Sequence, residues 1–85
     1  MIYDSGTITR NTTKTYKFTD NYDLILIILI SGEITVTTEA EKLLEYSSGG
    51  QLPNVHLYKN IKANDLISVY RGSVAPAGFV VLNIN

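Results

Sequence analysis

The chain of 85 residues contains no cysteine and no tryptophan, and it has one histidine and two prolines. Without cysteine, disulfides and thiolate metal sites are excluded. One histidine cannot build a His-rich metal site, so we expect no metal or other cofactor. The seven basic and eight acidic residues are scattered along the chain, whereas a nucleic-acid surface needs clustered Lys and Arg. We therefore expect no nucleic-acid partner.

The sequence also lacks the patterns of a leader and of a membrane helix. Residues 1–6 show no basic region followed by an apolar stretch, so we expect no signal peptide. The longest apolar run is Leu24–Ile30, which is far shorter than the roughly 20 residues of a membrane helix. We expect no membrane partner.

Most of the chain has the character of β-strands. Thr, Ile and Val are abundant and there are six Tyr, which suit a pleated surface. Turn signals divide the chain into about seven or eight short strands. This pattern predicts a single all-β domain over residues 1–85, an antiparallel β-sandwich of jelly-roll type.

The run Leu24–Ile30 is the strongest strand signal. Ser31-Gly32 follows it, and Glu33–Thr37 then alternates with a period of two. Two strands around such a break predict a hairpin, with Ile34 and Val36 turned to the core and the intervening Thr residues outward. Because an apolar strand at a sheet edge invites aggregation, Leu24–Ile30 should be central.

Residues 39–46 are compatible with two structures. Glu39–Glu45 consists of good helix formers, and Thr38 with Glu41 matches a helix capping box, which favours a short helix. Leu44 and Tyr46 equally fit a strand, and β neighbours can override helix propensity.

Leu24–Ile30 is apolar on both faces, which raises the question of what covers the second one. Burying three large side chains stabilises by roughly 4–9 kcal/mol, against a total stability on the order of 4–13 kcal/mol for this length. Either a segment of the same chain covers that face, or another copy does. The second explanation predicts a homo-oligomer with these residues at its interface: Ile25, Ile27, Leu29, Phe79 and Val81.

No residue set amounts to an active site, so we expect a protein that is not an enzyme. His56 titrates near neutral pH, but a place at the rim of a strand explains it. Asp20, Asn21 and Asp23 offer oxygens to calcium, although an Asx turn explains them better. The acidic residues Glu39, Glu41 and Glu45 fit a solvated face. The residues with most to offer a ligand are Tyr46, Tyr58 and His56.

The end of the chain carries a resemblance to known folds. Val55–Val69 leads through Asn64-Asp65 into an apolar strand, and a Gly78-Phe79 strand closes the chain. This resembles the closing strands of jelly-roll domains of the tumour-necrosis-factor and complement-head type, where Gly-Asp is usual at that turn. Asn also tolerates the left-handed conformation. The resemblance implies a homo-oligomer, with a trimer favoured.

The whole chain is also similar in style to small jelly rolls of bacteriophage structural proteins, such as head decorations, head fibres and tail or baseplate parts. That resemblance implies a self-assembling virion component with other virion proteins as partners. The alternatives are a carbohydrate- or receptor-binding module using Tyr and Asn in loops 47–54 and 71–78, and a small cupin-like enzyme. The expected location is the virion, or alternatively the cytoplasm.

Overall fold

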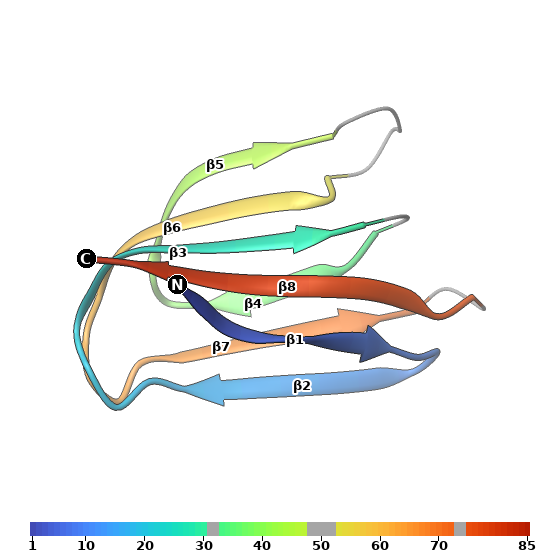
Figure 1. Cartoon of the computed structure of the whole chain (residues 1–85), viewed down its shortest axis with the longest axis horizontal. Helices are drawn as coiled ribbons and strands as arrows, with labels where there is room; N and C mark the ends of the chain where they lie inside the picture. The colour runs from blue at the N-terminus through green and yellow to red at the C-terminus, as the bar shows by residue number, and fades with distance from the viewer. Residues whose placement is uncertain (31–32, 48–52, 73–74) are drawn as a thin grey trace.

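Two antiparallel sheets form the described part of the computed structural model, which covers residues 1–30, 33–47, 53–72 and 75–85 (Figure 1). The strands are β1 (Ile2–Ile8), β2 (Thr12–Lys17), β3 (Tyr22–Leu29), β4 (Thr35–Thr38), β5 (Glu41–Tyr46), β6 (Val55–Ile61), β7 (Leu66–Arg71) and β8 (Ala77–Ile84). The larger sheet has the order β1-β8-β3-β6-β5 and the smaller sheet the order β2-β7-β4. The chain therefore forms a two-layer sandwich.

Successive strands alternate between the two sheets, except β5 and β6, which are neighbours in the larger sheet. This winding is jelly-roll-like, and it confirms the predicted all-β antiparallel sandwich. Both termini lie at one end of the sandwich, where the Met1 ammonium group donates a hydrogen bond to the Asn83 carbonyl at 3.2 Å.

Strand β3 is the middle strand of the larger sheet, as the sequence predicts for residues 24–30. Its two edges pair with β6 and β8, so that Ile27 lies opposite His56 on one side and Val81 on the other. The predicted hairpin with residues 33–37 is wrong, because β4 pairs with β7 in the other sheet. With both edges of β3 occupied, β4 has no place beside it. Ser31 and Gly32 lie outside the described residues.

The alternative of a short helix at 39–46 is wrong. Residues 41–46 of this segment form β5, which pairs with β6 and places Leu44 opposite Leu57. The Thr38 hydroxyl accepts the Ala40 N–H at 3.1 Å, but it also donates to the Leu66 carbonyl at 2.8 Å, so it shapes a turn between strands. Pairing with an open edge of β6 overrides the helix propensity of the segment.

The core lies between the sheets and is built mostly from alternate residues of β3, β6, β7 and β8. Ile25, Ile27 and Leu29 of β3 point into it and are at most 1% exposed. As predicted, Ile34 is buried and Val36 packs against the core, while Thr35 and Thr37 face outward.

The turn between β6 and β7 has the form expected for Asn64-Asp65. Asn64 adopts a positive φ of 76°, and its N–H donates to the Phe18 carbonyl at 2.7 Å. The Asp65 carboxylate accepts the Lys62 N–H at 2.9 Å. The loop between β6 and β7 is thereby hydrogen-bonded to Phe18, the residue that directly follows β2.

Truncation of the β3 core tests this packing. We expect Ile27→Ala to lower the free energy of unfolding by about 2–5 kcal/mol, since it leaves a cavity among fully buried neighbours. Thr37→Ala, on the outward face of β4, should change it by less than about 0.5 kcal/mol. Urea denaturation measures both. A loss below about 1 kcal/mol in Ile27→Ala would contradict the placement of this side chain.

Candidate functional site

The outer face of the larger sheet is apolar across its whole width. One row of directly paired residues crosses all five strands: Ile2, Leu82, Leu26, Leu57 and Leu44. None of the five side chains is buried, and Leu44 is 47% exposed. The next row along the strands continues the apolar character over four strands with Val80, Ile28, Val55 and Tyr46, and its member on β1 is Ser5. We call these nine residues the outer face.

The charged side chains in this part of the sheet lie at its margin. Glu41 and Lys59 are paired across β5 and β6, and their side chains form an ion pair of 3.2 Å. Since the two charges offset each other, the outer face combines apolar side chains with a locally neutral rim.

The smaller sheet shows what a solvated face looks like in the same protein. Its outward residues are mainly hydroxylic, with Thr15, Ser68 and Thr37 forming one cross-strand row. The hydroxyls of Thr15 and Ser68 are hydrogen-bonded at 2.9 Å. In an antiparallel sheet with one face in water, apolar inward residues normally alternate with polar outward residues along each strand. The outer face of the larger sheet departs from that pattern.

The predicted interface residues belong to the other side of the larger sheet. Ile25, Ile27, Leu29, Phe79 and Val81 are all at most 3% exposed and lie in the core between the sheets. Side chains buried within one chain cannot also contact a second copy, so this assignment is corrected. The apolar set left over is the alternate one on the same two strands, which includes Leu26 and Leu82.

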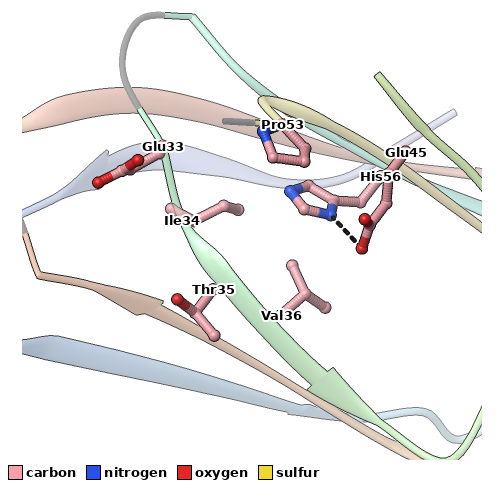
Figure 2. Close-up of a pocket in the computed structure, with 7 residues that line it drawn as sticks. All are labelled: Glu33, Ile34, Thr35, Val36, Glu45, Pro53 and His56. Atoms are coloured by element: carbon pink, nitrogen blue, oxygen red, sulfur yellow. Dashed lines mark ion pairs between the residues drawn. The ribbon is translucent and has the colours of Figure 1, made fainter. Parts of the chain in front are cut away.

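A pocket opens at the edge of the sandwich between β4 and the strands β5 and β6. Its volume is about 290 Å³. Apolar walls are provided by Ile34, Val36 and Pro53, and polar groups by Glu33, Thr35, Glu45 and His56 (Figure 2). The pocket thus combines a hydrophobic lining with one imidazole and two carboxylates.

His56 is the most unusual group in this pocket. Its side chain is on the core side of β6 and 3% exposed, and neither ring nitrogen has a hydrogen-bond partner among the described residues. Oε1 of Glu45 lies 3.7 Å from Nδ1. Burial lowers the pKa of His56, although the Glu45 carboxylate and the Pro53 carbonyl favour the protonated ring. The imidazole is therefore neutral at pH 7.

The three residues considered for ligand binding do not come together. His56 lines the pocket, whereas Tyr58 is 3% exposed within the core, where burial raises its pKa to about 12. Tyr46 belongs to the outer face and is 56% exposed. Tyr46 and Tyr58 therefore do not form a shared stacking platform. Loops 47–54 and 71–78 are described only in part.

Three of the remaining polar candidates, Asn21, Glu41 and Glu45, have structural partners. The Asn21 side-chain oxygen accepts the Ala63 N–H at 2.8 Å, so this residue links two loops of the fold instead of bonding its own turn. Glu41 and Glu45 are separated by the sheet, since one pairs with Lys59 and the other lies beside His56. Among the described residues, no group of three or more His, Asp or Glu side chains is arranged to hold a metal ion. No helix in that part of the chain is long and apolar enough to cross a membrane.

Arg71 is a buried charged residue that sequence reasoning missed. Its guanidinium group donates to the Ala75 carbonyl at 3.0 and 3.1 Å and to the Glu33 carbonyl at 2.6 Å. It therefore ties the segment before β4 to the segment before β8. Its alternation with Ile67 and Val69 on β7 was a signal that it points inward.

Comparison with known proteins gives no relative. No protein family, no curated protein and no solved structure matches the chain. Any function must therefore be argued from the outer face and the pocket.

The environment of His56 predicts a pH dependence of stability. Because the unfolded chain takes up its histidine proton near pH 6.5 and the folded protein only at lower pH, stability falls as the pH drops from about 7.5 to 5.5, by up to about 1.4 kcal/mol per unit. His56 is the only histidine, so His56→Leu should remove this slope. Urea denaturation at one protein concentration measures it. An equal slope in both proteins would contradict the assignment.

Proposed function

We propose that this protein is a non-enzymatic, self-assembling structural protein whose copies associate through the outer face of the larger sheet. The observation that carries the proposal is the apolar row that crosses all five strands, from Ile2 on β1 to Leu44 on β5. A sheet face of this composition is typical of strands buried on both sides.

The size of the apolar surface supports a second copy as its partner. Beside the two rows of the outer face lies a third, in which Leu24 is paired with Ile84 before the row ends at the ion pair of Glu41 and Lys59. Five strands about 4.8 Å apart, over the roughly 20 Å that three rows occupy, define an area of about 480 Å². Two such areas together bury about 1,000 Å², which is near the lower limit for a specific interface.

Its charge also supports a copy of the same chain. A face pairing with itself must not bring like charges together, and the outer face contains none. The ion pair of Glu41 and Lys59 at its margin is already neutralised within each chain. Homodimer interfaces are more apolar than other interfaces, in keeping with this composition.

The number of copies depends on how the faces meet. Stacking one outer face on another, about 10 Å apart, generates a twofold dimer. The resemblance of residues 55–82 to trimeric jelly rolls favours three copies around an axis. Both arrangements remove the outer face from water, and the molar mass in solution distinguishes them.

We further propose that the assembly is a bacteriophage virion component, such as a capsid decoration, a head fibre or a tail part. The jelly-roll-like sandwich and the absence of a metal-binding group among the described residues support an attachment or building role over a cupin-like enzyme. Capsid, portal or tail genes next to its own gene would support this proposal, and a setting of metabolic genes would count against it.

Substitution at the centre of the outer face tests self-assembly. We expect the wild-type protein to run as an oligomer and Leu26→Lys to run as a folded monomer, because a charge in a dry apolar interface is unpaired. Thr15→Lys adds the same charge to the solvated face of the smaller sheet and should leave the oligomer unchanged. Size exclusion with light scattering measures the mass, and circular dichroism checks the fold.

Two results would refute the proposed assembly. One is a monomeric wild-type protein at tens of micromolar. The other is a Leu26→Lys variant that keeps the mass of the wild type while Thr15→Lys behaves as expected.

A further inference from the structure

The pocket at the sandwich edge is separate from the outer face and suggests a second activity. It lies where β4 is an open edge of the smaller sheet, because β5 pairs with β6 instead of β4. Access comes from the side of the sandwich, and the outer face of the larger sheet takes no part in the lining. Self-assembly through that face therefore leaves the pocket free.

His56 contributes a buried polar group to the wall of the pocket. A buried polar group without a hydrogen bond is costly, and both ring nitrogens of His56 are in that position. Figure 2 shows one nitrogen directed to Glu45 and the other facing the space between Pro53 and Ile34. A molecule that enters the pocket, either a ligand or a water, can form a hydrogen bond with this second nitrogen.

The carboxylate of Glu45 determines which kind of ligand group fits. At 3.7 Å from Nδ1, it favours the tautomer that carries the proton on this nitrogen. Nε2 is then an acceptor, so the ligand must supply a donor. The charged residues that line the pocket are Glu33 and Glu45, both acidic. Figure 2 shows the Glu33 carboxylate directed away from His56, so Glu45 is the group that favours a cationic donor over a neutral one and disfavours an anion.

Among the described residues, the cation paired with this carboxylate is Lys42. Its Nζ lies 3.5 Å from Oε1 of Glu45, but its side chain is 55% exposed, and an exposed pair of this kind is weak. The described residues that line the pocket include no basic one. Glu45 therefore remains available to balance a positive charge inside the pocket.

We propose that the pocket binds a small organic ammonium ion, which donates to Nε2 of His56 while its carbon chain packs against Ile34, Val36 and Pro53. The volume of about 290 Å³ is sufficient for a short alkyl chain with its ammonium group. A free alkylamine and the side chain of a lysine both carry this chemistry.

The single histidine makes the test direct. In protein labelled with ¹³C and ¹⁵N at histidine, the ring signals report on His56 alone. We expect n-butylammonium at pH 7.5 to shift these signals saturably and to bind at least about tenfold tighter than n-butanol, with butyrate weakest. A blocked lysine peptide added in a parallel titration distinguishes the sources: binding as tight as that of butylammonium favours a lysine side chain, and weaker binding a free amine.

Two variants test whether the carboxylate of Glu45 contributes to this binding. Glu45→Gln should weaken butylammonium binding about tenfold and leave butanol unchanged, and the matched Glu41→Gln, on the other side of the same strand, should have no effect. Equal affinities for the three probes, the absence of saturation, or a Glu45→Gln variant that binds butylammonium like the wild type would overturn the proposal. The oligomer mass of each variant is measured alongside, so a failure here is distinct from a failure of self-assembly.

Discussion

The structure depends on one strand that is apolar on both faces. The side chains on both faces of β3 are aliphatic and need to be covered, and both of its edges need hydrogen-bonding partners. β6 and β8 pair with the two edges. This central position excludes β4 from a place beside β3, and β4 pairs with β7 in the smaller sheet. It also brings Leu26 next to Leu57 and Leu82, so that the apolar character of one strand becomes that of a whole sheet face.

The two sheets consequently have different roles. The smaller sheet has the usual division between a buried and a wet surface, with Thr15, Thr37 and Ser68 outward. The larger sheet buries one surface in the core and leaves the other, the outer face, uncovered by the described part of the chain. Where the sheets fail to close on each other, beside β4, the neutral imidazole of His56 is exposed to a pocket without being exposed to bulk water. The surface proposed for assembly and the pocket proposed for ligand binding therefore lie on different sides of one small sandwich.

Sequence reasoning succeeded where a pattern had one physical reading. Ile34 and Val36 alternate with Thr, and only one of the two faces can be the core side. It failed where both faces of a strand were equally apolar. Residues 25, 27 and 29 are as aliphatic as residues 24, 26 and 28, so the sequence did not indicate which of the two sets faces the core. The same holds for Phe79 and Val81 on β8. The pocket had no local signal beyond His56, because its walls come from separate strands.

The sequence by itself determined the all-β fold class, the central place of β3 and the existence of a second apolar face on that strand, since all three follow from the pattern of side chains along the strands. Tertiary structure alone decided which face is buried, that residues 41–46 form a strand, and that His56 meets Glu45 and Ile34 at an open edge. The physical reason is that periodicity is a property of each strand, whereas partner, register and layer are set by competition among all strands for the same edges and the same core.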